Sequence, residues 1–393
     1  MKYYLYIQDR TYTLKIGNMK KRKIIYTGPF DPCLCDGVSA STFDLLGFLK
    51  EEGHEVSITS FMHNCEFSVE SLQCFIKDNS IKDLSFENNK LHYTHSGIDV
   101  NIEYLSYDRQ QVLQCHPEVL KRYLAEVNKN KESYFISADC DFSALMALTV
   151  SGNDFVHYVR SPIFVVNTYK NAPLLKNILK GKKVIVNSEF SRRKIEEELG
   201  VFSSFVLPPF ISSRRFSFRQ LGDVRHHNRN IGYYSAGKHK GDEIVGRLIE
   251  RLPDCNFIIM GAGAYDMSLK KNNSCLVGKT VDLGKFYNEI SVMLVPSTCP
   301  EGYSRVVLES AFNGIPVIAS RMGGIPEAAG DSGILVDMNG TLEEIVERYV
   351  EKINGLFASP VQYESYRNKA WNRGICYQKD ICRLTRDFAD KFF

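Results

Sequence analysis

The chain has 393 residues, of which 44% are hydrophobic and 24% charged, and its formal net charge is +3. This length exceeds what one ordinary hydrophobic core supports, so it indicates about two domains, and the composition is that of a globular protein. The small net charge does not favour a nucleic-acid partner, and no run approaches the roughly 20 apolar residues of a membrane-spanning helix.

The cysteines and the first residues bear on the compartment. Eleven cysteines form an odd set spread along the chain, without a Cys-x-x-Cys pair, which is typical of free or buried thiols in a reducing compartment. The start MKYYLYIQDR lacks the apolar segment of a secretory signal. We therefore expect a cytoplasmic protein. The close pair Cys33 and Cys35 has no nearby His or Cys partners, so we expect no metal site there.

Residues 1–22 form a prefix before the first clear strand. Residues 1–18 show weak alternation, which is compatible with an extra hairpin. The basic run from Lys20 to Lys23 is typical of a solvated lead-in to a strand. It is also compatible with contact to anionic lipid, which would place the protein peripherally at the inner membrane face.

The first half of the chain alternates strands and helices. Lys23–Thr27 predicts a strand, residues 28–37 a loop, and Val38–Glu52 a helix that Gly53 closes before a strand at Val56–Ser60. Further strands are predicted at Tyr134–Ala138, Phe155–Val159 and Val184–Asn187, and helices at Phe142–Val150 and Ser191–Leu199. This pattern implies a parallel sheet, and we expect the first domain to span residues 23–207.

The second half restarts the same alternation after a connection rich in arginine that extends to about Asn230. Strands are predicted at Ile231–Tyr234, Phe257–Met260, Val292–Val295, Ile315–Ala319 and Gly333–Val336, and a helix at Glu243–Arg251. Continuous apolar runs of this kind mark strands that are covered on both faces. We expect an α/β protein of two doubly wound, Rossmann-like domains that face one another across a cleft, the second spanning residues 208–370. Such sheets bind ligands beyond the carboxyl ends of their strands.

The most informative stretch runs from Pro300 to Ser320. Glu301 and Glu309 stand eight positions apart across the start of a predicted helix, which begins near Tyr303 and ends at Asn313-Gly314. The first N–H groups of such a helix offer an anion site, and the two carboxylates can accept hydrogen bonds from sugar and ribose hydroxyls. These parts fit a nucleotide sugar. The alternative is an ordinary amphipathic helix with glutamates on its surface.

Other candidates lie where strands end. Gly37 follows the first strand and permits a phosphate to approach the backbone, whereas Asp36 beside it predicts a helix N-cap. Lys238 and Lys240 follow the first strand of the second half, where an ammonium group could neutralise a diphosphate, although lysines in turns are often only solvated. His157 lies near the end of a predicted strand in the first half. It is a candidate for contact with the transferred sugar, and the alternative is a core residue.

Two activities find no support in the sequence. Gly261-Ala262-Gly263 lacks the rest of a dinucleotide fingerprint, so a nicotinamide site is not expected. The visible motifs also do not assemble a hydrolase triad, and His226-His227 in the connection has no acidic or cysteine partners nearby.

Taken together, these residues resemble the retaining glycosyltransferases of family 4, also called glycosyltransferase group 1, which have the GT-B fold. The resemblance covers the chain from about Lys23 to its end. Residues 301–309 look like the Glu-x7-Glu motif of that family. The segments that follow also resemble the family's sequence, at Gly314–Val317, Gly323–Glu327 and Gly333–Val336.

The resemblance implies a role for each matching residue. Glu301 would contact the donor sugar, Glu309 would accept from the ribose, Lys240 would contact the diphosphate, and Gly37 would approach it from the first domain. Backbone amides would hold sugar and phosphate at Gly302, Tyr303, Ser304, Arg305 and Val306. The arginine that usually precedes the Lys-Gly pair is absent from residues 233–237, so Lys238 would substitute for it, or the phosphate site would be weaker than in the family. Residues 371–393 would form a helix that crosses back to the first domain.

The expected function is the retaining transfer of a sugar from a nucleoside-diphosphate sugar, with UDP-sugar favoured by the resemblance, to an acceptor hydroxyl in glycan or glycoconjugate biosynthesis. We expect no metal and no cofactor. The alternatives are a sugar-nucleotide epimerase and a non-catalytic GT-B binding partner. The sequence leaves open the sugar, the base, the linkage, the oligomeric state and the acceptor, which can be a glycan, a lipid-linked molecule, a small molecule or a protein.

Overall fold

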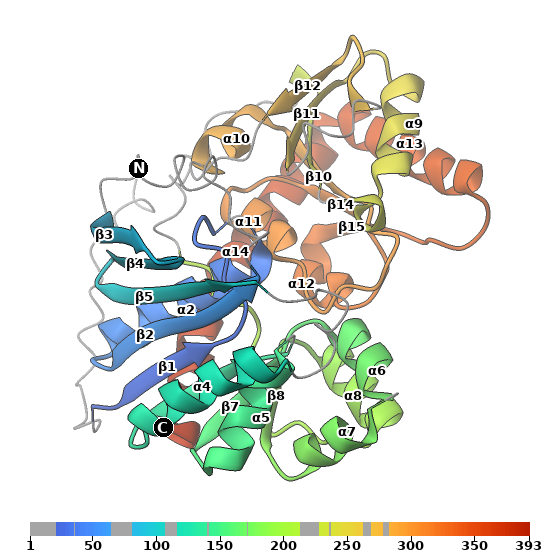
Figure 1. Cartoon of the computed structure of the whole chain (residues 1–393). Helices are drawn as coiled ribbons and strands as arrows, with labels where there is room; N and C mark the ends of the chain where they lie inside the picture. The colour runs from blue at the N-terminus through green and yellow to red at the C-terminus, as the bar shows by residue number, and fades with distance from the viewer. Residues whose placement is uncertain are drawn as a thin grey trace.

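The structure is a computed structural model that describes residues 21–34, 36–63, 81–106, 116–139, 141–170, 172–212, 228–235, 237–261, 269–277 and 283–393. Within these ranges the chain forms two α/β units, each built on its own sheet (Figure 1). The expected hairpin in residues 1–18, Cys35 and the His226-His227 pair lie outside the described residues.

The first unit is built on a nine-stranded sheet in the order β3-β4-β5-β2-β1-β6-β7-β8-β9. Its strands are β1 (Lys23–Thr27), β2 (Glu55–His63), β3 (Ile81–Glu87), β4 (Lys90–His95), β5 (Ile98–Leu105), β6 (Tyr134–Ala138), β7 (Phe155–Val159), β8 (Lys183–Val186) and β9 (Phe205–Val206). Its helices are α2 (Gly37–Glu51), α4 (Pro117–Lys129), α5 (Phe142–Ser151), α6 (Pro162–Lys170), α7 (Pro173–Lys180) and α8 (Glu189–Leu199). Strand pairs are parallel except at β3, β4 and β5, where a hairpin and a second antiparallel pair extend the sheet.

The second unit is built on a six-stranded parallel sheet in the order β12-β11-β10-β13-β14-β15. Its strands are β10 (Asn230–Ser235), β11 (Asn256–Gly261), β12 (Ser274–Val277), β13 (Val292–Val295), β14 (Val317–Ser320) and β15 (Gly333–Val336). Its helical segments are η5 (Lys238–Lys240), α9 (Asp242–Arg251), α10 (Leu283–Glu289), α11 (Arg305–Phe312), α12 (Ile325–Ala329), η7 (Gly330–Ser332) and α13 (Leu342–Ala358). Every residue of β13 and β14 is buried, as expected for strands covered on both faces.

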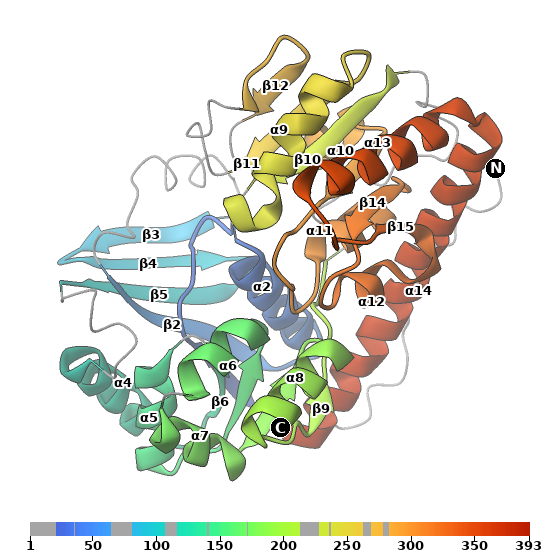
Figure 2. The same cartoon turned by 90° about the vertical axis from the view of Figure 1, so that its right-hand side faces the viewer.

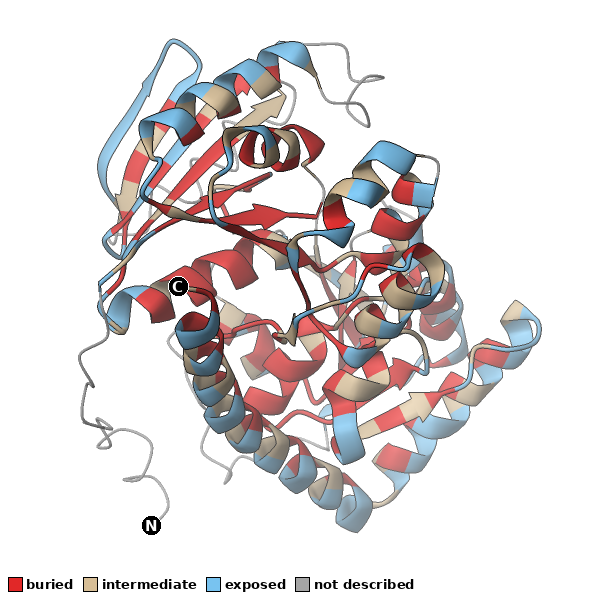
Figure 3. Ribbon diagram, turned by 90° about the horizontal axis from the view of Figure 1, so that it is seen from below, coloured by how far each residue is buried: buried red, intermediate tan, exposed pale blue. Residues whose placement is uncertain are grey.

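The last helix, α14 (Pro360–Phe392), runs along both units (Figure 2). Near its start the Tyr363 hydroxyl donates to the Ser291 carbonyl oxygen at 2.9 Å, which ties it to the second unit. Near its end Arg386 pairs with Glu52 of the first unit at 2.9 Å, and the Phe388 ring lies 6.1 Å from the Phe205 ring. Figure 3 shows the resulting stripe of buried residues along α14. The helix therefore begins before Trp371, the residue at which the sequence analysis expected it to begin.

Two helix starts position the site. Asp36 caps α2, since its carboxylate accepts from the N–H groups of Val38 and Ser39 at 2.8 Å each, and this confirms the predicted N-cap. Helix α11 ends at Asn313, and Gly314 takes a φ of +61°, so the predicted C-terminal signal is confirmed. Its start is Arg305 rather than the predicted Tyr303, because Ser304 is still extended.

Candidate functional site

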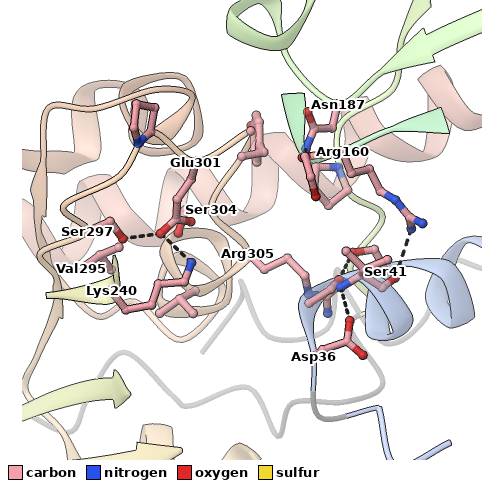
Figure 4. A pocket seen from close by; sticks show the side chains of 18 of the residues that line it. Asp36, Ser41, Arg160, Asn187, Lys240, Val295, Ser297, Glu301, Ser304 and Arg305 are labelled. Carbon is pink, nitrogen blue, oxygen red and sulfur yellow. Dashed lines mark hydrogen bonds and ion pairs between the residues drawn. The ribbon is translucent and has the colours of Figure 1, made fainter. Parts of the chain in front are cut away.

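A cavity of about 560 Å³ lies between the two sheets and is lined by residues of both units (Figure 4). Its first-unit wall includes Gly37 at the start of α2, Arg160 directly after β7 and Asn187 directly after β8. Its second-unit wall includes Lys240, which follows β10, and Ser297, which follows β13. The cavity therefore opens at the carboxyl ends of the strands, where doubly wound sheets bind ligands.

Most of the predicted site residues come together in this cavity. The lining includes Gly37, Lys240, Glu301, Gly302, Tyr303, Ser304, Arg305 and Val306. It does not include Lys238, Glu309 or His157.

Lys240 and Glu301 form a charged pair on the cavity wall. The Lys240 Nζ lies 2.8 Å from the Glu301 Oε1, and the Ser297 hydroxyl donates to the same oxygen. The side chains are 29% and 14% exposed, so the pair is only partly screened by solvent. A single wall thus presents a cation for phosphate beside an acceptor for sugar hydroxyls.

Two glycines allow this pair to form. At Gly241 a Cβ would lie 2.2 Å from the Pro296 carbonyl oxygen, and the φ of +98° also disfavours other residues, so the Lys-Gly turn packs directly on the segment after β13. At Gly302 a Cβ would lie 2.2 Å from the Arg160 carbonyl oxygen. The backbone of the motif therefore touches the first unit at the centre of the cavity.

Glu309 lies beneath the cavity lining, one helical turn after Arg305. It is 7% exposed, and its carboxylate accepts from Arg305 at 3.1 Å and from the Tyr287 hydroxyl at 2.9 Å. Burial raises the pKa of Tyr287 well above its usual range, and the Glu309 charge raises it further. Tyr287 therefore stays protonated and continues to donate to Glu309.

Arg305 links the two units below the cavity. Its guanidinium donates to Asp44 of α2 at 3.1 Å and to the Phe210 carbonyl oxygen at 3.0 Å, in addition to Glu309. Burial alone would lower the pKa of Arg305, but the charges of Glu309 and Asp44 outweigh it and the pKa is raised. Arg305 is therefore a permanent cation shared between the units.

The structure corrects the placement of His157. Its side chain is fully buried and its Nδ1 lies 2.8 Å from the Ser137 Oγ. Desolvation lowers the pKa of His157 to about 4, so the ring is neutral near neutral pH. All five residues of β7 are buried, so His157 lies inside the sheet core and not at the strand end that faces the cavity. We assign His157 no contact with a substrate.

Lys238 also lies outside the cavity. It is exposed on η5, and its carbonyl oxygen accepts from the Gly241 N–H at 3.0 Å. Of the two lysines in this turn, the structure brings only Lys240 to Glu301.

Arg160 braces the first-unit wall. Its guanidinium donates to Thr42 Oγ1 at 2.6 Å, to the Val38 carbonyl oxygen at 3.1 Å and to the Tyr26 hydroxyl at 3.2 Å. These contacts hold the first turn of α2 beside Gly37. Asn187 and Ser297 were not among the predicted site residues, although polar residues directly after predicted strands are a readable signal.

Two features are absent from the described residues. There, no group of three or more His, Cys, Asp or Glu side chains is placed to hold a metal ion. None of the helices in the described part of the chain is both long and apolar enough to span a membrane.

Comparison with known families gives a direct match for the second unit. Residues 241–357 match the family model described as "Glycosyl transferases group 1". This confirms the predicted resemblance to glycosyltransferase group 1. The matched range contains the Glu301–Glu309 motif and begins directly after Lys240.

Curated relatives share shorter segments. The sulfoquinovosyl transferase SQD2 of Arabidopsis thaliana is 30% identical over 125 residues, which cover 28% of this chain and 24% of that protein. The O-antigen chain mannosyltransferase B of Escherichia coli is 30% identical over 100 residues, which cover 25% of this chain and 24% of that protein. The chain thus spans about a quarter of the length of these two relatives.

Solved structures match almost the whole chain. The sucrose-phosphate synthase from Thermosynechococcus elongatus aligns with a TM-score of 0.70 at 16% identity, covering 94% of this chain and 99% of that one. The Anabaena protein HepE in complex with UDP and glucose aligns with a TM-score of 0.69 at 14% identity and the same coverage. These similarities show that the group 1 segment sits within a complete GT-B fold, with two Rossmann-like units facing across the cleft.

Proposed function

We propose that the chain is a glycosyltransferase that moves a sugar from a nucleoside-diphosphate sugar to an acceptor hydroxyl. The observation that carries this proposal is the pairing of Lys240 with Glu301 at 2.8 Å on a cavity wall made by the group 1 motif. A lysine and a glutamate in contact can bind two different parts of one ligand. The lysine takes the phosphate, and the glutamate accepts hydrogen bonds from the sugar beside it.

The donor is held mainly by the second unit. Its diphosphate lies between Lys240 and the N-terminus of α11, whose first amides and dipole favour an anion. Glu301 accepts from sugar hydroxyls, Glu309 accepts from the ribose, and Gly37 allows α2 to approach the diphosphate from the opposite wall. Uridine is the favoured base, because the structures of HepE and of the pneumococcal O-GlcNAc transferase GtfA both contain UDP.

The transfer proceeds with retention, through attack on the same face of the sugar that the phosphate leaves. Among the described residues, two carboxylates line the cavity, and both are engaged: Asp36 caps α2, and Glu301 is held by Lys240 and Ser297. Neither is placed as a free nucleophile. The bond from the anomeric carbon to the phosphate oxygen breaks, its electron pair stays on that oxygen, and the oxygen takes the proton of the attacking hydroxyl as the new bond forms.

The protein contributes positioning and charge stabilisation. Lys240 stabilises the negative charge that grows on the departing diphosphate, a contribution of about 3 kcal/mol for one well-placed donor. No metal ion is needed if Lys240 and the amides before α11 carry this charge. The acceptor approaches from the first unit, where Pro162, Ile163 and Phe164 form an apolar part of the lining.

The proposed setting is glycan or glycoconjugate synthesis in the cytoplasm. Support for the setting comes from the O-antigen mannosyltransferase among the relatives, and support for the compartment from the free thiols at Cys33 and Cys255.

The first test is binding by thermal shift, because a ligand that binds the folded chain raises its melting temperature. The purified full chain is measured with UDP, GDP and ADP and their common sugars, beside Glu301→Gln and the control Glu343→Gln on the exposed surface of α13. We expect one base to stabilise the wild type and the control, and its sugar to add stability that Glu301→Gln loses. The absence of any shift with all three diphosphates would contradict the proposal.

Turnover then separates transfer from the other activities. The anomeric configuration of the product, followed by proton NMR, distinguishes retention from inversion. A new sugar nucleotide formed without an acceptor would instead indicate an epimerase.

A further inference from the structure

The buried contact between Arg305 and Asp44 connects the two halves of the cleft at its base. Asp44 lies on α2 of the first unit and its side chain is 3% exposed, while the side chain of Arg305 on α11 is 8% exposed. Their atoms Oδ2 and Nη2 are 3.1 Å apart. Charge pairs so deeply buried form only with close geometry, because each charge loses its water.

The same guanidinium also holds Glu309. Nη2 of Arg305 lies 3.1 Å from Glu309 Oε1, so one nitrogen is shared between a carboxylate of each unit. Nε donates to the same Glu309 oxygen at 3.2 Å, and Nη1 donates to the Phe210 carbonyl oxygen at 3.0 Å in the segment between the units. The Cδ of Arg305 would be 3.5 Å from a Cβ at Gly37, so the arginine stem fills the floor of the cavity.

The sharing of Arg305 between Asp44 and Glu309 affects how readily Glu309 can accept a hydrogen bond from a ligand. A guanidinium–carboxylate fork places one N–H on each carboxylate oxygen, whereas here Nε and Nη2 both lie against the single oxygen Oε1 of Glu309. Asp44 shares Nη2 and so holds the guanidinium in this arrangement, away from the second oxygen of Glu309. The second oxygen of Glu309 receives the neutral Tyr287 hydroxyl at 2.9 Å, and because a carboxylate oxygen has two lone pairs it has capacity for one more hydrogen bond.

We propose that Asp44 is a positioning residue for the ribose subsite: by sharing Arg305 it sets how freely Glu309 accepts hydrogen bonds from the donor ribose. The inference rests on the proposed function, because it takes Glu309 as the ribose acceptor. It predicts that a residue in the acceptor-side unit controls recognition of the nucleoside in the opposite unit. Recognition of the ribose then depends on closure of the cleft, since Asp44 reaches Arg305 only when the units are together.

Helix α2 supplies a matched control. Glu52 also lies at the end of α2 and pairs with an arginine of the later chain, Arg386 of α14, at 2.9 Å. This pair fastens the end of α14 to the first unit, and neither of its residues lines the cavity. Glu52→Gln and Asp44→Asn therefore each neutralise a carboxylate that pairs with an arginine, and only Asp44 shares its arginine with Glu309.

The experiment measures ribose discrimination rather than affinity alone. Dissociation constants of UDP, GDP and ADP and of their 2′-deoxy and 3′-deoxy forms are determined by calorimetry for the full-length wild type, Asp44→Asn and Glu52→Gln. For the diphosphate that binds best, we expect the wild type to prefer the ribose form at least tenfold, since a hydrogen bond to a charged group is lost in the deoxy form. Asp44→Asn should reduce that ratio at least fivefold, and Glu52→Gln should leave it unchanged.

Each outcome decides a separate point. If Asp44→Asn weakens ribose and deoxy forms equally, the residue is merely structural and the inference is wrong. If no diphosphate binds the wild type, the proposed function fails and the inference with it. Arg305→Lys covers the case in which Asp44→Asn does not fold, because an ammonium offers a single nitrogen where the guanidinium divides three among Asp44, Glu309 and the Phe210 carbonyl oxygen; an unchanged ratio in that variant overturns the inference.

Discussion

Gly302 offers a sharp test of how closely the two units must approach for the site to work. In Gly302→Ala the new Cβ would lie 2.2 Å from the Arg160 carbonyl oxygen and 2.9 Å from both Asn187 Nδ2 and Pro162 Cδ. Ordinary contacts of carbon with oxygen are about 3.3 Å or longer, so the two walls must separate by about 1 Å. The oxygen belongs to backbone and cannot rotate away.

The size of the effect follows from this displacement. A misplacement of about 1 Å between substrate-positioning groups lowers catalysis by about 100-fold. Overpacking of this kind also lowers the free energy of unfolding by about 1–3 kcal/mol. We expect kcat/KM for the donor to fall by about two orders of magnitude, and the melting temperature to fall by a few degrees.

A second glycine provides the control for Gly302→Ala. Gly355 lies within α13 and a Cβ there would meet no atom within 4 Å. Gly355→Ala should leave kcat/KM unchanged and raise the free energy of unfolding by about 0.5–1 kcal/mol, because alanine favours a helix. Initial rates of donor consumption and thermal unfolding of both variants make the comparison. Wild-type kcat/KM in a folded Gly302→Ala variant would refute the argument that the units close at this point during the reaction.

Three further changes test other parts of the structure. Lys240→Ala removes the ammonium next to Glu301 and should lower kcat by about 100-fold, with a smaller change in donor affinity, in steady-state kinetics; a change in affinity alone would contradict its role in charge stabilisation. Phe388→Ala should lower the free energy of unfolding in denaturant by about 3–5 kcal/mol, because the ring is fully buried between α14 and the first unit, whereas Phe202→Ala at a 78% exposed ring should change it by less than about 0.5 kcal/mol. The pKa of His157 is about 4 in the folded state and about 6.5 in the unfolded state. The unfolded state therefore binds more protons between these values, so the free energy of unfolding falls by about 3 kcal/mol in total as the pH falls through this window. Denaturant unfolding at pH 7.5 and pH 5 should show a smaller loss for His157→Gln than for the wild type, and equal losses would contradict the buried neutral imidazole.

The strands that the sequence predicts best are those with a continuous apolar run and a clear breaker at each end. Lys23–Thr27, Tyr134–Ala138, Phe155–Val159 and Val292–Val295 have the predicted bounds in the structure. The extension formed by β3, β4 and β5 was not predicted. Its β5 strand has the alternation of buried and exposed residues of a half-buried strand, but β3 is exposed along almost its whole length and gives no such signal.

Residues could be predicted to line the cavity where their position at the end of a strand or the start of a helix is enough to place them there. Gly37, Lys240 and the run from Glu301 to Val306 lie at strand ends or helix starts, and all reach the cavity. His157 was placed wrongly because it lies inside β7, whose five residues are all buried, and not beyond the carboxyl end of the strand. Arg160, directly after the strand, lines the cavity instead.

The contacts of Glu309 could not be predicted from the motif, because they depend on partners far away in the sequence. Its spacing from Arg305 places both on one helix face, which is a local rule, but Tyr287 and Asp44 reach them only through the fold. The motif alone therefore does not reveal that Glu309 is one member of a buried network whose other members come from distant segments.

The cleft is a joint product of the two units, and this explains why its chemistry depends on their arrangement. Besides the Arg305–Asp44 pair and the approach of Gly302 to Arg160, the Glu327 carboxylate of α12 accepts from the N–H groups of Glu189 and Phe190 at the start of α8, at 2.8 Å and 3.3 Å. Each contact is lost if the units separate, and the first two lie beside or beneath residues that we assign to the donor. A donor that touches both walls binds the closed arrangement more tightly than an open one, so its binding energy and the closure of the cleft are linked. The three contacts hold the walls in place before the donor arrives, which lowers the entropy that binding must overcome.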